Sequence, residues 1–298
     1  MDLGPALLER LDGDVVVSPY GLARALAAIR AGATGETREA LARIDDVPEV
    51  EGILSAQAVW LGEGYTAGAA LDGIDSGPLD LDRINAWSNE KTRGMIPRIL
   101  EQLDADEVFV LTDAEYLEAK WTFPFDGTWT APFEGAGEVT MMGVEGTFEY
   151  AEDAIRLPYK AGDLRFVAMM GDTPASWSKG FGNVGLPRFS TTSSLELARP
   201  LIDLGLGPAF TDSADLDELI VGPGRKALQR VLQRARVDVD EEGTRAAATT
   251  AVTARAVAFR QPDFQITFDR PFTWAVEHAP SGTLLFVGRV LNPTERSD

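Results

Sequence analysis

Residues 241–262 constrain this chain more than any other stretch, because a charged entry and a glycine are followed by a long, alternating run of small residues. The stretch reads EEGTRAAATTAVTARAVAFRQP. If it formed a strand, every second residue from Thr244 would share one face, and that face would carry no charge and no large side chain. Arg245 and Arg255 would both lie on the other face. Alanine is a poor strand former, so the stretch suits an exposed segment that can later enter a sheet.

Length and charge bound the fold and exclude several partners. With 298 residues, 45 % of them hydrophobic, the chain can bury a large core, and we expect one domain over residues 1–298. Its formal net charge is −20 at pH 7. The sequence has no basic patch, so we expect no nucleic acid, heparin-like polyanion or membrane as a partner. The acidity is typical of a surface that keeps a protein soluble.

The inventory of reactive residues argues against catalysis. The chain has no cysteine, which excludes disulfides and thiol chemistry. Its one histidine, His278, precedes an expected turn, and no nucleophile elbow or phosphate-binding glycine loop is present. The acidic residues within 212–218 lack the glycine and the spacing of a calcium loop and favour a helix start instead. We therefore expect no enzyme, no metal and no cofactor.

Residues 241–250 resemble the reactive-loop hinge of the serpin family, in which small residues let a cleaved loop insert into the main sheet. The hinge positions are Glu241, Glu242, Gly243, Thr244, Ala246, Ala247, Ala248 and Thr250. Further segments follow the family in order: residues 17–19, 32–37, 84–87, 91–96, 186–189, 214–216 and 286–294. Because these segments span nearly the whole chain, it resembles a shortened inhibitory serpin of the prokaryotic type.

The resemblance implies an α+β serpin fold with a large mixed main β-sheet, two smaller antiparallel sheets, surrounding helices and an exposed reactive-centre loop. Ser18 and Pro19 independently predict the start of a helix that Gly32 closes. Residues 45–52 are too few for the long helix that binds heparin in some members, so we expect that helix to be absent. Several other helices are expected to be shortened, and no heparin site is expected.

Hydrophobic periodicity and turn residues predict the remaining elements. Helices are expected at residues 5–11, 36–44, 65–71, 81–100 with interruptions at Gly94 and Pro97, and 193–204. A shortened region with little helix is expected at residues 173–182. Strands are expected at residues 15–17, 53–61, 109–120, 139–142, 147–150, 155–157, 164–170, 227–240, 264–268, 273–277 and 284–290.

Two regions of the family's sheet have counterparts here. Trp121 aligns with the breach, where loop insertion begins, although an ordinary core tryptophan is the alternative. The shutter, where the central strands must part, often holds two serines, an asparagine and a histidine. By alignment these positions are Ser18, Gly21, Asp113 and Gln233. Glutamine can donate to an ionised aspartate, so a polar cluster can still form. The alternative is that these residues form no functional cluster. Because they differ from the residues that the family often carries, the ease with which the sheet opens does not follow from the resemblance.

The resemblance also implies a mechanism in which the chain is attacked. A serine protease would cleave the loop and form an acyl-enzyme, and insertion of the severed loop would distort the protease before the ester is hydrolysed. The family's spacing from Gly243 places the scissile bond at Val257-Ala258, which suits an elastase- or subtilisin-like protease. Arg255 and Arg260 are alternatives, and either implies a trypsin-like target.

Two other readings compete with this one. A non-inhibitory serpin would be cleaved without trapping the protease, but such members carry bulky or charged hinge residues that residues 246–252 lack. An enzyme of another kind would show turnover in place of a fixed stoichiometry.

The expected partner is therefore a serine protease held covalently. We expect a monomer that can also polymerise when one molecule's loop enters another's sheet. The first residues show no signal peptide, so a cytoplasmic protein is expected, or a secreted one if a leader has been removed.

Overall fold

A computed structural model describes residues 1–51, 53–71, 74–104, 107–160, 162–224, 226–244 and 261–293. The chain divides into two compact units, and it passes between them repeatedly. Unit 1 comprises Met1–Leu11, Val17–Tyr116 and Thr192–Arg236, and unit 2 comprises Asp12–Val16, Leu117–Thr191 and Val237–Asp298. Neither unit is a continuous segment, and a single domain over residues 1–298 stays a prediction.

Unit 1 holds the described helices. They are α1 (Leu3–Leu8), α2 (Pro19–Ala31), α3 (Gly35–Leu41), α4 (Leu81–Lys91) and α5 (Ala198–Leu201), the 3-10 turns η1 (Ala69–Leu71) and η3 (Gly207–Phe210), and the π turn η2 (Ile202–Leu206). The prediction for α2 is confirmed, because the Ser18 hydroxyl caps it by accepting from the Gly21 amide at 3.1 Å. Residues 42–51 contain no helix, which confirms that the long helix expected there in the family is absent.

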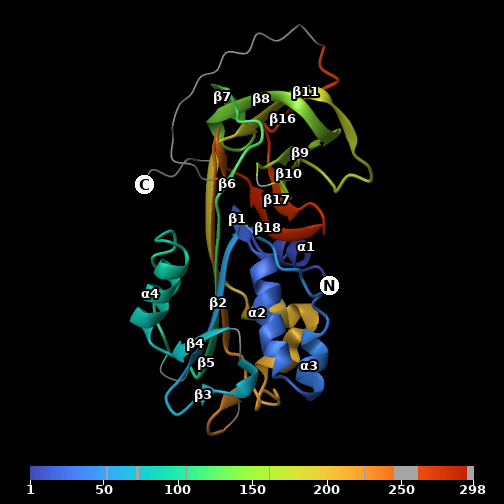
Figure 1. The fold of residues 1–298 in the computed structure, drawn as a ribbon. Helices are drawn as coiled ribbons and strands as arrows, with labels where there is room; N and C mark the ends of the chain where they lie inside the picture. The colour runs from blue at the N-terminus through green and yellow to red at the C-terminus, as the bar shows by residue number, and fades with distance from the viewer. Residues whose placement is uncertain are drawn as a thin grey trace. The chain divides into compact units, whose positions relative to one another are not determined.

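Four of the strands in unit 1 belong to a mixed sheet, and two others form a separate pair. They are β2 (Ile53–Leu61), β3 (Thr66–Ala67), β4 (Asp75–Pro78), β5 (Phe109–Leu117), β13 (Ile220–Val221) and β14 (Arg230–Val239), of which β5 and β14 continue into unit 2. The sheet runs in the order β4-β2-β5-β14, and β3 pairs separately with β13. β5 and β14 are parallel, and Gln233 lies opposite Asp113. Figure 1 shows α4 on one face of β2 and β5 and helices α2 and α3 on the other.

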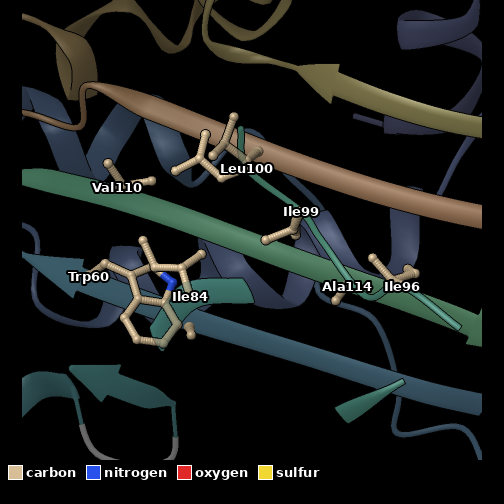
Figure 2. Close-up of a cluster of buried hydrophobic side chains, with 9 residues drawn as sticks. Trp60, Ile84, Ile96, Ile99, Leu100, Val110 and Ala114 are labelled. Carbon is tan, nitrogen blue, oxygen red and sulfur yellow. The ribbon is translucent and has the colours of Figure 1, made fainter. Parts of the chain in front are cut away.

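A buried apolar cluster joins α4 to its face of this sheet (Figure 2). Ile84 from α4 and the segment that follows it contact Trp60 and Val110, and the Trp60 indole donates to the Thr112 hydroxyl at 2.8 Å. The helix expected over residues 81–100 is therefore shorter than predicted. It ends at Lys91 because Arg93 and Gly94 both adopt left-handed backbone conformations, with φ of 54° and 85°.

Unit 2 is built around a nine-stranded sheet, in which β8 pairs antiparallel with β7, β9 and β11, while β16 runs parallel to β11. Its strands are β1 (Val15–Val17), β7 (Gly127–Phe133), β8 (Gly137–Ala151), β9 (Ala154–Pro158), β10 (Leu164–Met169), β11 (Ser178–Pro187), β16 (Phe264–Thr267), β17 (Phe272–His278) and β18 (Thr283–Val290). The order is β1-β18-β17-β10-β9-β8-β11-β16, and β7 pairs with β8. Figure 1 shows β7, β8, β11 and β16 together at one end of this unit. Two short strands, β6 (Ala119–Lys120) and β15 (Gly243–Thr244), complete unit 2.

Several predicted elements are wrong in type or extent. The helix expected at residues 193–204 begins as strand β12 (Phe189–Glu196), because alternate residues there are buried in a ladder with β14. Helical turns follow only from Ala198, and Gly205, with a φ of 92°, interrupts them. The two strands expected at 139–142 and 147–150 are one strand, β8, whose glycines stay inside the ladder.

Other differences are smaller. Residues 65–71 form a strand and a 3-10 turn instead of a helix, and residues 212–219 form turns without the helix start predicted for their acidic residues. β11 begins within the segment expected to be a shortened region. None of the helices in the described ranges combines the length and apolar character that crossing a bilayer requires.

Candidate functional site

The predicted hinge begins with a tight turn at the end of β14. The Asp240 carboxylate accepts from the amides of Glu242 and Gly243, at 2.9 and 3.1 Å, and the Asp240 amide donates to the Gly243 carbonyl at 3.0 Å. Aspartate commonly closes such turns by bonding to the backbone two residues on. The chain therefore reverses direction here and returns antiparallel to β14.

The first hinge residues form a strand, β15, between the end of β14 and β6. Thr244 lies opposite Val239 of β14, while Gly243 and Thr244 lie opposite Lys120 and Ala119 of β6. A Cβ atom at Gly243 would be 2.2 Å from the Ala119 carbonyl oxygen, so only glycine fits without a shift. The hinge thus pairs within the sheet at Gly243 and Thr244, which follow Glu241 and Glu242.

The Thr244 side chain sets the inward face of the hinge. Thr244 is 0 % exposed, and its hydroxyl is 2.5 Å from the hydroxyl of Tyr159. Burial raises the pKa of Tyr159, so the phenol stays protonated and can donate. Because side chains alternate along a strand, the residues at even numbers after Thr244 would share this face if β15 were extended.

An aromatic cluster within unit 2 contacts the turn at the end of β14. It comprises Trp121 at its centre, with Phe125, Tyr159 and Phe166 around it. The Trp121 ring stacks on Tyr159, with centroids 4.5 Å apart and planes at 7°, and meets Phe125 and Phe166 edge-on. Its indole donates to the Asp240 carbonyl at 2.8 Å, and its amide donates to the Glu242 carbonyl at 2.9 Å. Trp121 therefore contacts the turn as well as buried rings, and its role as the breach residue stays a prediction.

Glu241 is anchored in the same unit. The Phe125 amide donates to its carbonyl at 2.9 Å, and its side chain pairs with Arg188. Tyr159 was not identified from the sequence. It follows the strand predicted at residues 155–157, and its partner Thr244 is 85 residues away, so no local pattern joins them.

The four predicted shutter residues lie together in unit 1. The Gln233 side chain bridges the start of α2 to β5: its oxygen accepts from the Ser18 amide at 2.7 Å, while its nitrogen donates to the Ser18 carbonyl at 2.8 Å and to Asp113 Oδ2 at 2.6 Å. A Cβ atom at Gly21 would lie 2.6 Å from both Asp113 oxygens. The expected polar cluster therefore forms.

Three residues of this polar cluster were missed by the sequence analysis: Ser55, Gln57 and Glu115. The Ser55 hydroxyl donates to Glu115 Oε1 at 2.6 Å, and the Gln57 amide donates to Asp113 Oδ1 and Glu115 Oε1 at 3.0 and 3.1 Å. Burial raises the pKa of Glu115 well above its usual value, and the adjacent Asp113 carboxylate raises it further. The two-residue spacing on each strand was the available signal, since it places these side chains on one face.

The remaining predicted positions are accounted for as follows. Val257, Ala258, Arg255 and Arg260 of the reactive bond, and Ala246, Ala247, Ala248 and Thr250 of the hinge, lie outside the described residues. His278 is at a turn, where its Nδ1 lies 2.7 Å from the Ser281 hydroxyl. In the part of the chain that the structure describes, no group of three or more acidic or imidazole side chains is arranged to hold a metal.

Known proteins resemble this chain over most of its length. A family model described as serpin (serine protease inhibitor) matches residues 65–180 and 171–293. The human protein Z-dependent protease inhibitor is 27 % identical, over 98 % of this chain and 82 % of its own length. The bovine leukocyte elastase inhibitor is 28 % identical, over 94 % and 93 %. The native-state structure of tengpin, a thermophilic serpin, superposes with a TM-score of 0.86 at 24 % identity, over 98 % of this chain and 92 % of tengpin.

Proposed function

Because the chain belongs to the serpin family of serine protease inhibitors, and is thus an inhibitor-type protein and not an enzyme, we propose that it is an inhibitory member that acts as a suicide substrate. The observation that carries this proposal is β15: the hinge already occupies a strand position between β14 and β6, with Gly243 in close approach and Thr244 buried. A loop that starts inside the sheet can lengthen this strand once it is cut.

The chemistry is supplied by the protease. Its serine oxygen attacks the scissile carbonyl, the peptide C–N bond breaks, and the new amino terminus leaves with a proton. The inhibitor remains joined to the serine as an ester. Water would hydrolyse this ester only while the oxyanion hole of the protease stays intact. Insertion of the severed loop carries the bound protease with it and distorts that site.

Insertion is favoured by the alternation of the hinge. Each added residue makes ladder hydrogen bonds worth about 0.5–1.5 kcal/mol, with further stabilisation from apolar burial. A charge on the inward face would oppose insertion, because burying an unpaired charge is costly. Thr244 fixes the phase of the strand, and the residues in phase with it from Ala246 to Ala256 carry no charge.

We place the scissile bond at Val257-Ala258, from the family's hinge-to-bond spacing, and infer an elastase- or subtilisin-like target. The bovine relative is named an inhibitor of leukocyte elastase. Cleavage after Arg255 or Arg260 would instead give a trypsin-like target. A non-inhibitory role is the second candidate, and the small residues after Gly243 argue against it.

The proposal is tested by incubating the protein with an elastase-like and a trypsin-like protease. We expect an SDS-stable complex with the elastase-like protease and a released peptide beginning at Ala258, identified by mass spectrometry. Cleavage without a complex and without a rise in thermal stability would support the non-inhibitory role.

A pair of hinge variants supplies the matched control. Thr250 is in phase with buried Thr244, so Thr250→Arg should abolish the complex and leave a cleaved substrate. Thr249 falls on the opposite face, so Thr249→Arg should still form the complex. Equal behaviour of the two variants would contradict insertion in this register.

A further inference from the structure

The polar cluster contains two carboxyl groups that no cation neutralises directly. Asp113 and Glu115 are both 0 % exposed, and among the described residues neither makes an ion pair. They occupy alternate positions of β5, so their side chains share the face that meets the start of α2. A Cβ atom at Gly21 would lie 2.0 Å from Glu115 Oε1 and 2.6 Å from both Asp113 oxygens, which puts the two carboxyl groups side by side.

The hydrogen-bond donors around the pair leave one oxygen without a partner. Both Asp113 oxygens accept from amides, and Glu115 Oε1 accepts from Ser55 and Gln57. Among the described residues, Glu115 Oε2 is buried and has no hydrogen-bond partner. A buried charged carboxylate without a donor on one oxygen is costly. A proton on Glu115 would neutralise this carboxylate and remove one of two adjacent negative charges.

The other groups facing the pair do not replace this proton. Arg24 of α2 attracts both carboxylates at longer range. Its guanidinium donates to the Tyr20 hydroxyl and also attracts the Glu49 carboxylate. Ser55, Gln57 and Gln233 are neutral. Burial raises the pKa of Asp113 and of Glu115, and the Asp113 charge adds to the effect on Glu115.

We propose that Glu115 is a positioning residue for loop insertion: it carries a proton that stabilises the closed junction of β5 and β14, and losing that proton eases their separation. The link to insertion rests on the proposed function. Gln233 and Asp113 are directly opposite on neighbouring strands and share a 2.6 Å hydrogen bond. A strand entering between them would roughly double their spacing of about 4.8 Å and break that bond.

The direction of the pH effect depends on whether the closed sheet or the opened chain binds the Glu115 proton more tightly. The closed sheet holds the proton at a pH where the opened or unfolded chain has already lost it. The stabilisation is therefore complete below the ordinary pKa of glutamate, and it decreases as the pH rises through the raised pKa of Glu115. Between these limits the opening equilibrium should rise by up to about tenfold per pH unit.

The first measurement needs no variant. In protein labelled with ¹³C at its carboxyl carbons, the Glu115 resonance should keep the shift of a protonated acid at pH values where exposed glutamates have titrated. Titration of Glu115 together with the exposed glutamates would overturn the proposal.

The second measurement follows thermal unfolding and peptide insertion from pH 5 to 9. The probe is a synthetic peptide with the sequence of residues 244–255, which should anneal to the uncleaved protein faster as the pH rises. Glu115→Gln keeps the shape of the protonated side chain, so its unfolding midpoint and annealing rate should vary much less with pH. At pH 8.5 its midpoint should exceed that of the unsubstituted protein.

The matched control is Glu118→Gln, which neutralises an exposed glutamate three residues away. Its pH profile should parallel that of the unsubstituted protein, and parallel profiles for Glu115→Gln as well would overturn the proposal. If Glu115→Gln does not fold, Asp113→Asn removes the like charge and should weaken the pH dependence, although burial still raises the pKa of Glu115. Complex formation with the protease is assayed separately, so failure of inhibition with an intact pH profile refutes only the proposed function.

Discussion

Strand β14 is joined to the segment that contains β5 and β6 by different chemistry in the two units. In unit 1, β5 and β14 pair directly and are tied by the polar cluster, whose hydrogen bonds run through Gln233. In unit 2, β6 and the end of β14 each pair with the hinge strand β15, and the aromatic cluster around Trp121 encloses the turn. The polar cluster therefore joins the two strands through two buried carboxyl groups, whereas the aromatic cluster holds the hinge strand through stacked rings and a phenol that burial keeps protonated.

This difference indicates which part of such a sheet can respond to pH. The burial of aromatic rings does not depend on pH. The rings contact one another and the backbone of the turn, so they accommodate a strand between β14 and β6. A buried acid pair depends on the proton and on direct contact between neighbours.

Trp121→Ala should cause the largest loss of stability, because it removes a ring that is 1 % exposed together with the hydrogen bond to Asp240. We expect the free energy of unfolding to fall by about 3–5 kcal/mol, measured by urea denaturation. The loss should be the same at pH 6 and pH 8.5. Trp129→Ala is the control, since Trp129 is 43 % exposed, and an equal loss there would contradict the role of the aromatic cluster.

Gly21→Ser restores the residue that the family often carries at this position, yet it should destabilise this chain. Its Cβ would meet the carboxyl oxygens of Glu115 and Asp113 at 2.0 and 2.6 Å. Overpacking of this kind costs about 1–3 kcal/mol, again measured by denaturation. Gly171→Ser is the matched control, because nothing lies within 4 Å of a Cβ there. A neutral result at Gly21 would mean that the carboxyl groups can move aside.

Tyr159→Phe should have the smallest effect of the three, because it removes only the hydroxyl that contacts Thr244. We expect a loss of about 0.5–1.5 kcal/mol and an accompanying increase in hydrogen exchange at the Thr244 amide. Tyr150→Phe is the control, since Tyr150 stacks on Phe264 through its ring. Unchanged exchange at Thr244 would show that the hydroxyl contact does not hold the hinge strand.

Much of the fold could be predicted locally, and the errors have a common cause. Ser18 and Pro19 start α2 because capping is a short-range interaction. The helix predicted at residues 193–204 was wrong because β14 supplies a ladder for β12 that no local signal reveals. The strands predicted at 139–142 and 147–150 merged because sheet neighbours hold the intervening glycines in β8.

The sequence indicated the serpin resemblance and the start of α2, and that resemblance implied the four shutter positions. The packing of distant segments decided that Glu115 and Gln57 join the polar cluster, that Tyr159 stacks on Trp121, and that Gly243 and Thr244 pair within the sheet. The physical reason is distance along the chain. Caps and turns form between residues a few positions apart, whereas burial of a charge or a hydroxyl depends on partners 56 to 85 residues away.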